Sequence, residues 1–331
     1  MFLLPEKIRF MKIGRYAFIL SILLTVGSLV SIAFKGFNLG LDFTGGTVVE
    51  VVFDRAIDLD HLRESFSEQS IDAQVQLMGN ANAVMMRFPP AQVRIVREDS
   101  SKEPVLSSQA TTQNSENATD KKAASMQMDG EQVLALLTRV SPENKATIKK
   151  VDVVGPQVGD ELRDKSGIAM IIALACMCLY VAFRFQYKFS LGALGALVHD
   201  TILTLGFFSF FQLPFDLNVL AAVLGVIGYS LNDTIVVFDR VRENFALLRE
   251  ETTENIIDIS ITQTLGRTLM TSICTLLVLL AMLILGGDAL FGFSLALTIG
   301  IVVGTYSSYY IASYILILTR LSKDDFFKVV D

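Results

Sequence analysis

The sequence predicts an α-helical membrane protein with six transmembrane helices and one small α+β domain between the first and second helices. Three observations lead to this prediction. Of the 331 residues, 52% are hydrophobic and only 19% are charged, whereas an ordinary soluble domain has about 25% charged residues. Six runs are apolar enough to cross a bilayer, and one long polar stretch, 35–166, separates the first run from the others.

The six apolar runs meet the length requirement of a membrane-spanning helix. Crossing the hydrocarbon core takes about 20 mostly apolar residues in helical form, because unpaired backbone groups are too costly there. The runs are 16–34, 167–183, 189–211, 217–238, 269–285 and 291–318. The first run follows several basic residues, as in a signal peptide, but its length of about 19 residues exceeds the usual apolar region of one. We therefore expect a retained anchor.

Basic residues in the short loops predict the orientation of the spans. Lys and Arg precede the first span, follow the last, and occur in the loops near 184–188 and 240–249, whereas the loops 212–216 and 286–290 contain none. Both termini and the basic loops are therefore expected in the cytoplasm. The expected segments are a cytoplasmic N-terminus with the first span (1–34), a periplasmic domain (35–166), a bundle of five spans (167–318) and a cytoplasmic tail (319–331).

The segment outside the membrane has the pattern of a small α+β domain. Its expected strands are 47–53, 73–77, 83–88 and 147–154, and its expected helices are 59–66 and 131–140. This β-α-β-β-α-β order is the ferredoxin-like arrangement. Three glycines within 40–46 predict a tight turn before the first strand. The polar stretch 98–125 has no apolar period, so we expect a mobile loop there.

Composition argues against several other classes of function. Cys176, Cys178 and Cys274 all lie within apolar runs, where they are expected to act as small hydrophobic residues and not as disulfides or ligands. His61 and His199 are far apart and have no metal-site spacing. The net charge of −6 comes without a basic cluster, so nucleic acid is not an expected partner. No nucleotide fingerprint occurs, so ATP is not an expected energy source and no cofactor is expected.

Ionisable side chains inside the predicted spans are the candidate functional residues. Asp233 lies in the fourth span, and Asp200, beside His199, lies near the middle of the third. A carboxylate in hydrocarbon costs about 3 kcal/mol on insertion scales, so such groups usually face the bundle interior and serve a pathway. The nearest candidate cation is Arg267, at the start of the fifth span. Together with Asn232, these residues are predicted to form a proton pathway.

Each of these candidates also has a purely structural interpretation. Asp233 can be a carboxylate that pairs with a cation only to stabilise the bundle. Arg267 can extend to the interface and serve as an orientation signal. Asp200 can be satisfied by His199 or by backbone groups. The proton-linked interpretation is favoured for Asp233, and both interpretations stay open for the other two.

Small residues predict where the spans pack closely. On the face of the third span that carries His199 they are Gly192, Gly195 and Gly206. On the face of the fourth span that carries Asn232 they are Ala221, Gly225 and Gly228. Hydroxyl side chains of the sixth span can face a hydrated interior, but such groups more often bond to their own helix backbone; these are Ser294, Thr298, Thr305 and Ser308.

Several motifs resemble those of SecF-type members of the SecD/SecF family. They are 42–46 (DFTGG), 154–159 (VGPQVG), 199–200 (HD), 228–244 (GYSLNDTIVVFDRVREN) and 266–268 (GRT), and they follow the usual order of the family. The likeness extends over the chain except for the polar stretch. That stretch departs from the compact external domain typical of the family.

The resemblance implies a place in the RND superfamily, in the bacterial cytoplasmic (inner) membrane, and a role in protein export driven by the proton motive force. It implies SecD, the SecYEG channel, YajC, the translocating polypeptide and membrane lipids as partners. The family's proton-conducting aspartate corresponds to Asp233, with Arg267 in support.

Two alternative functions stay open at this point. One is an RND-type exporter of lipids or drugs, whose external loops would be larger and paired. The other is an intramembrane aspartyl protease that uses Asp200 and Asp233 as a dyad sharing one proton. In that case the two carboxylates would have to meet, although their predicted depths differ by about two helical turns.

Overall fold

The computed structural model describes residues 8–68, 73–78, 80–88, 133–135, 137–138 and 144–322. The chain forms two compact units. The helical unit comprises Met1–Asn38 and Ser166–Asp331, and the sheet unit comprises Leu39–Lys165.

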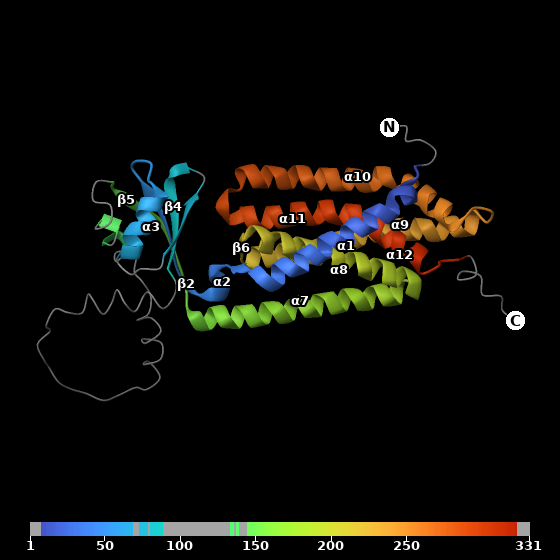
Figure 1. Ribbon diagram of the computed structural model, residues 1–331, viewed down its shortest axis with the longest axis horizontal. Coiled ribbons are helices and arrows are strands. Elements are labelled where there is room, and N and C mark those ends of the chain that lie inside the picture. The colour runs from blue at the N-terminus through green and yellow to red at the C-terminus, as the bar shows by residue number, and fades with distance from the viewer. Residues whose placement is uncertain are drawn as a thin grey trace, which may run out of the picture. The chain divides into compact units, whose positions relative to one another are not determined.

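Six helices in the described part of the chain are long and apolar enough to cross a membrane, which confirms the predicted number of spans. The first five are α1 (Phe10–Lys35), α7 (Pro156–Arg184), α8 (Tyr187–Phe211), α9 (Leu217–Leu247) and α10 (Thr253–Leu285). The sixth is α11 (Gly287–Ser307), which continues through the π-helix η1 (Ser308–Ala312) into α12 (Ser313–Leu318). Two short strands, β1 (Asn38–Leu39) and β6 (Pro214–Phe215), also occur. In the bundle, α8 packs against α1 and α9, and α11 packs against α9 and α10 (Figure 1).

Several of the helices, α9 and α10 among them, are longer than their apolar runs. The run in α9 ends at 238, but the helix continues to Leu247, and α10 begins at Thr253 instead of 269. The extension of α9 carries an ion pair one turn apart, between Arg240 and Glu243 (2.6 Å). The extension of α10 is capped by Thr252, whose hydroxyl accepts a hydrogen bond from the backbone N–H of Asn255. Hydropathy detects only the part of a helix that lies in the membrane, so it misses such polar ends.

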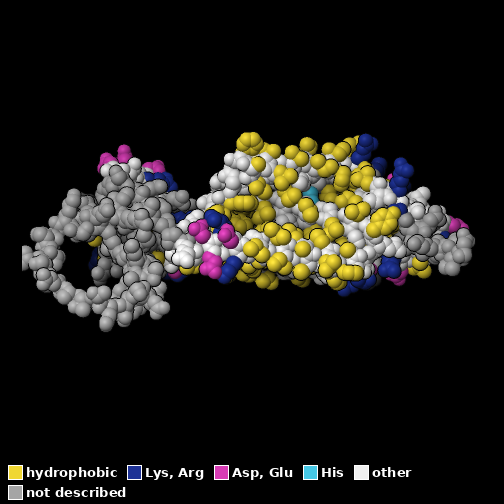
Figure 2. All heavy atoms as spheres, turned by 90° about the horizontal axis from the view of Figure 1, so that it is seen from below, with side chains coloured by type: hydrophobic (Ala, Val, Ile, Leu, Met, Phe, Trp, Pro, Cys, Tyr) yellow, Lys and Arg dark blue, Asp and Glu magenta, His cyan; other side chains and the backbone are white. Residues whose placement is uncertain are grey.

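The surface of the helical unit has the distribution expected of a membrane protein. Figure 2 shows apolar side chains covering the middle of this unit on the face in view, with Lys, Arg, Asp and Glu gathered toward its ends. Large apolar residues on several helices are exposed, among them Phe34, Phe183 and Leu285. An apolar band of this kind is matched by the acyl chains of a bilayer.

The core of the helical unit confirms one predicted packing face and corrects the other. A side chain at Gly192 would meet the carbonyl oxygen of Ala312 at 2.9 Å, so α8 does pack closely through its glycine face. On α9, however, Gly225 and Asn232 are exposed. This helix buries the adjacent face, which carries Asp233. The expectation that Ala221, Gly225, Gly228 and Asn232 form a tight contact is therefore wrong within this chain.

The N-terminus of α1 is capped by a side chain from a distant helix. Arg9, at the N-cap position, makes no side-chain cap. Instead, the backbone N–H of Met11 donates to Oδ1 of Asp258 on α10 (2.9 Å), and Asp258 is only 4% exposed. A carboxylate here accepts a hydrogen bond from an N–H that has no partner within the helix. Its negative charge also interacts favourably with the positive end of the helix dipole.

Removing this cap is expected to weaken the attachment of α1. We expect Asp258→Ala to lower the free energy of unfolding by about 1 kcal/mol, the usual cost of losing a helix cap. Asp258→Asn keeps an acceptor oxygen at the same place and should recover most of the loss. The midpoint of thermal unfolding in detergent measures both variants, and equal midpoints for Ala and wild type would contradict the capping role.

The sheet unit contains a four-stranded antiparallel sheet in the order β3-β4-β2-β5. Its elements are α2 (Leu41–Thr44), β2 (Gly46–Phe53), α3 (Leu59–Glu68), β3 (Gln74–Met78), β4 (Asn80–Phe88) and β5 (Ala146–Val154). Alternate residues of β2, such as Val49 and Val51, enter a core with Phe66 of α3 and Phe88 of β4. Of the expected helix 131–140, residues 133–135 and 137–138 are described and helical. The expected mobile loop 98–125 lies outside the described residues.

The predicted glycine turn is a single helical turn closed by two glycines in the left-handed region. Gly45 has φ 65° and Gly46 has φ 120°, values that glycine adopts without strain. Thr44 of this turn accepts a hydrogen bond from Arg87 of β4 (3.0 Å). Burial lowers the pKa of the Arg87 guanidinium, although the negative charge of Asp42 acts in the opposite direction and raises it. The turn is thereby fixed to the sheet.

A third glycine, on α7, lets the backbone of this turn approach closely. A Cβ atom at Gly159 would lie 2.8 Å from the backbone nitrogen of Gly45. We expect Gly159→Ala to cost about 1–2 kcal/mol of stability, because backbone atoms must move to make room. Gly167→Ala, on the same helix with open space around it, is the matched control. Equal thermal midpoints for these two variants would contradict the close contact.

Candidate functional site

The carboxyl group of Asp233 is buried at the meeting point of three helices. Asp233 is only 1% exposed, and it lies on the inner face of α9. Its carboxyl group interacts with the hydroxyls of Ser272 on α10 and Thr305 on α11, which are 2.9 Å from each other. Its Oδ2 atom is fully buried and has no hydrogen-bond partner. The side chain is therefore surrounded by neutral polar groups and retains one free acceptor.

Aromatic hydroxyl groups complete the surroundings of Asp233. Tyr309 of the π-helix forms a hydrogen bond with Thr268 of α10. The phenol of Tyr309 is electrostatically coupled to Asp233 and to Tyr229. The site thus draws polar atoms from α9, α10, α11 and η1.

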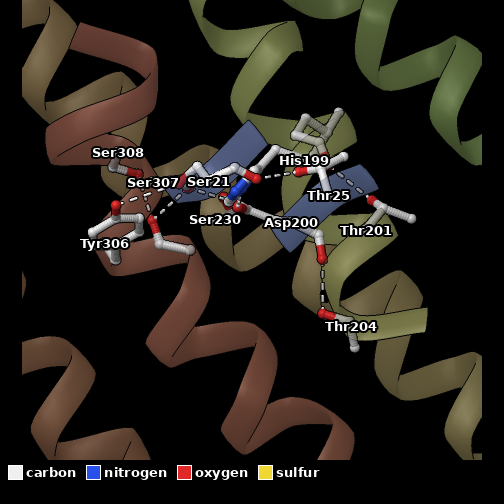
Figure 3. Close-up of polar contacts among 12 residues, drawn as sticks. Ser21, Thr25, His199, Asp200, Thr201, Thr204, Ser230, Tyr306, Ser307 and Ser308 are labelled. Carbon is white, nitrogen blue, oxygen red and sulfur yellow. Dashed lines mark hydrogen bonds and ion pairs between the residues drawn. The ribbon is translucent and has the colours of Figure 1, made fainter. Parts of the chain in front are cut away.

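Asp200 forms a second, separate polar cluster. Figure 3 shows its carboxylate surrounded by hydroxyl groups from neighbouring helices. Ser230 of α9 donates to Oδ2 at 2.5 Å, and Ser307 of α11 donates to the same oxygen at 2.7 Å. Nδ1 of His199 lies 2.9 Å from Oδ1. Asp200 therefore joins α8, α9 and α11, and each of its oxygens has a partner.

The two clusters meet where α11 passes into the π-helix. Ser308, the first residue of η1, shares a hydrogen bond with Thr234 of α9 (2.8 Å). Ser307, one residue earlier, binds Asp200, and Tyr309, one residue later, lies by Asp233. Short π-helical segments within α-helices often mark functional sites. A movement of η1 would therefore affect both carboxyl groups.

The predicted ion pair between Asp233 and Arg267 does not form within the described chain. Arg267 is exposed, and the described residues give it no ion-pair partner. Its neighbour Thr268 is the residue that points inward, so Arg267 lies about 100° further around α10, on the outer face. Asn232 is likewise exposed, because the adjacent Asp233 occupies the inner face of α9.

Sequence reasoning missed the inward polar face of α10. Thr264, Thr268 and Ser272 recur every four residues, which is the signal that could have revealed this face. Among the hydroxyls predicted on the sixth span, Ser294 and Thr298 bond to their own helix backbone. The other two, Thr305 and Ser308, face the polar clusters.

The arrangement is suited to binding and releasing a proton. A buried carboxyl group with a free oxygen and only neutral neighbours can exist in both protonation states. No fixed cation holds it in the ionised form, and one of its oxygens has no hydrogen-bond donor.

Within the described residues, no group of three His, Cys, Asp or Glu side chains is placed to hold a metal ion.

Comparison with known families identifies the architecture. Residues 132–322 match the family described as "Protein export membrane protein SecD/SecF, C-terminal", and residues 30–57 match the "SecD/SecF GG Motif". The chain belongs to the SecD/SecF family. The second match contains the closed turn of Gly45 and Gly46, and the first contains Asp200 and Asp233.

Relatives and a solved structure agree with this membership of the SecD/SecF family. The chain is 46% identical to "Protein translocase subunit SecF" of Pseudomonas aeruginosa, over 96% of this chain and 93% of the relative. It is 37% identical to the protein of the same name from Escherichia coli O157:H7, over 95% and 88%. The crystal structure of SecDF from Thermus thermophilus, described as a translocon-associated membrane protein, superposes with a TM-score of 0.78 at 33% identity. That match covers 97% of this chain, which spans 40% of the SecDF chain.

Proposed function

We propose that this chain is a SecF-type accessory subunit of the Sec translocase that uses the proton motive force to assist protein export. Family membership and relatives named as translocase subunits support the export role. The observation that carries the proton-linked part is the buried carboxyl group of Asp233 with its free Oδ2 atom. In this proposal Asp233 takes up protons from the outer side and releases them to the cytoplasm.

A proton-driven cycle at Asp233 has enough energy to change the packing of the bundle. One charge that crosses about 100 mV releases about 2.3 kcal/mol, and each unit of pH difference adds about 1.4 kcal/mol. Together these can bias a two-state equilibrium by roughly a hundredfold or more. No cofactor is required, because the gradient supplies the energy.

The contacts of Asp233 suggest how protonation changes the bundle. The ionised carboxylate only accepts hydrogen bonds, so the hydroxyl groups of Ser272 and Thr305 are favoured in orientations that donate to it. The protonated form becomes a donor, so these hydroxyls must reorient and the attraction weakens. Since Ser272 belongs to α10 and Thr305 to α11, the protonation state would alter how both helices pack on α9. The π-helix η1, which carries Tyr309, is the segment best placed to absorb that change.

The loop charges, the sheet and the exposed residues of the chain support a proposed location, domain fold and set of partners. The alternation of basic loops supports an inner-membrane protein with both termini in the cytoplasm and the sheet unit in the periplasm. The strand order of that unit supports a ferredoxin-like domain.

Two polar residues on the spans, Asn232 and Arg267, are exposed in this chain. A partner chain is favoured over lipid as their cover, because lipid offers them no hydrogen bonds. SecD is the proposed partner, with SecYEG, YajC and the exported polypeptide in the same assembly.

The protease alternative is disfavoured by the separation of the two carboxyl groups. Asp200 binds Ser230, Ser307 and His199, whereas Asp233 faces Ser272 and Thr305. In the described structure no hydrogen bond joins the two, so they do not form a dyad that shares a proton. The exporter alternative has no support in the names of the relatives.

Export into membrane vesicles tests the proposed function. Vesicles with and without this chain, both containing the channel and SecD, are supplied with a secretory polypeptide and its ATP-driven motor, and protease-protected product is measured. We expect the chain to raise the amount of product only while a proton gradient exists, and an ionophore to remove the difference. A difference of equal size after the gradient has been dissipated would refute proton coupling. Copurification from native membranes tests the proposed partners separately.

A further inference from the structure

Two buried polar atoms without a partner lie on the same helix. Within the described residues, only three buried side-chain nitrogen or oxygen atoms lack a hydrogen bond: Nε2 of His199, Oη of Tyr229 and Oδ2 of Asp233. The last two belong to α9. Leaving such a group unsatisfied costs about 1–3 kcal/mol, so two of them on one helix require a physical explanation.

The two atoms are on the same side of the helix. Tyr229 and Asp233 are four residues apart, which places them on the same face at a separation of one turn. Tyr309, across from α9 on the π-helix, is electrostatically coupled to both. The unpaired phenol and the unpaired carboxyl oxygen therefore belong to side chains on one face of α9, and both act electrostatically on Tyr309 of η1.

The chemistry of this region fits a bound water molecule. Buried polar groups that lack a protein partner are usually satisfied by ordered water, and such a water needs two to four polar partners. Oη of Tyr229 can donate to it, and Oδ2 of Asp233 can accept from it. The hydroxyls of Ser272 and Thr305, which already interact with Asp233, provide further contacts. The other charged or titratable groups nearby are Tyr309, which is hydrogen-bonded to Thr268, Asp200 with His199, in their own cluster, and Arg267, on the outer face of α10.

We propose that Tyr229 and Asp233 bind a water molecule between them, and that Tyr229 is a positioning residue for proton transfer to Asp233. This inference rests on the proposed function of Asp233. In the transfer step, an excess proton on the water passes to Oδ2: one O–H bond of the protonated water breaks, an O–H bond forms on the carboxyl group, and neutral water remains. Tyr229 keeps its own proton and holds the water in line with Oδ2.

Infrared spectroscopy of the full-length protein in membranes tests both parts of the inference. Exchange into H2-18O shifts the O–H stretching band of a bound water but not that of a protein hydroxyl. A pH jump then gives the rate at which the carboxyl band of Asp233 rises, and Asp233→Asn identifies that band. Tyr229→Phe keeps the ring and removes only the hydroxyl. Tyr180→Phe is the matched control, because Tyr180 is 50% exposed on α7.

We expect one isotope-sensitive water band that is lost in Tyr229→Phe, shifted in Asp233→Asn because an amide oxygen is a weaker acceptor than a carboxylate, and unchanged in Tyr180→Phe. In Tyr229→Phe, protonation of Asp233 should slow by about tenfold or more, because the donor is no longer aligned. An unchanged water band or an unchanged rate in Tyr229→Phe overturns the inference while the proposed function stands. If the carboxyl band of the unaltered protein does not respond to pH, the proposed function and the transfer step are both overturned.

Discussion

Replacing Asp233 by asparagine is expected to abolish the contribution of the proton gradient to export while the protein stays folded in the membrane. Asparagine has nearly the shape of aspartate and can still form hydrogen bonds with Ser272 and Thr305, but its amide does not bind and release a proton. Export of a secretory reporter, in cells depleted of the native copy, should fall to the level of cells that lack the chain. Immunoblotting measures the amount of variant protein.

The matched control for this prediction lies on the same helix. The side chain of Asp239 on α9 is 44% exposed and pairs with Arg184 at 3.2 Å. Such an exposed ion pair contributes little to stability, so Asp239→Asn should export nearly normally. Normal export by Asp233→Asn at full protein level would contradict the proton-linked role, whatever the control shows.

The position of Asp233 could be predicted from the sequence, but its neighbours could not. An acidic residue in an apolar run must be buried among helices, and this is independent of how the helices are rotated. Its partners depend on that rotation. The fifth span is apolar on most sides, so its hydrophobic pattern does not determine which face turns inward. Arg267 was the expected partner, whereas the inward face carries Thr268 and Ser272.

The fold was predictable to a similar extent. Apolar runs gave the six spans, and alternation of apolar residues gave the strands of the sheet, because both depend on local periodicity. The π-helix at Ser308–Ala312 has no such signal. It depends on contacts made by residues distant in sequence, such as the hydrogen bond between Ser308 and Thr234. The small-residue face of α9 was misassigned for the same reason, since small residues show that a helix can be approached closely but not by which partner.

Replacing Gly300 by alanine is expected to be the most destabilising single-methyl change at the interface between α9 and α11. A Cβ atom at Gly300 would overlap the side chain of Val226, whose own Cβ would be only 2.9 Å away. Valine is branched at that carbon and has little rotameric freedom to move aside. We expect a loss of about 3 kcal/mol in unfolding free energy from overpacking, despite the higher helix propensity of alanine.

The same interface supplies the control and connects packing to function. Gly225→Ala, on the facing helix, would place its methyl at an ordinary 3.4 Å from Leu297, so its thermal midpoint should equal or exceed that of the wild type. In Gly300→Ala, the added methyl group would push α11 away from α9. This shift would also lengthen the hydrogen bond between Thr234 and Ser308 and move Thr305 away from Asp233. Loss of gradient-dependent export should therefore accompany the lower midpoint. A Gly300→Ala protein as stable and active as Gly225→Ala would show that α11 can shift on α9 without disturbing the site, and would remove the basis for linking helix packing to the state of Asp233.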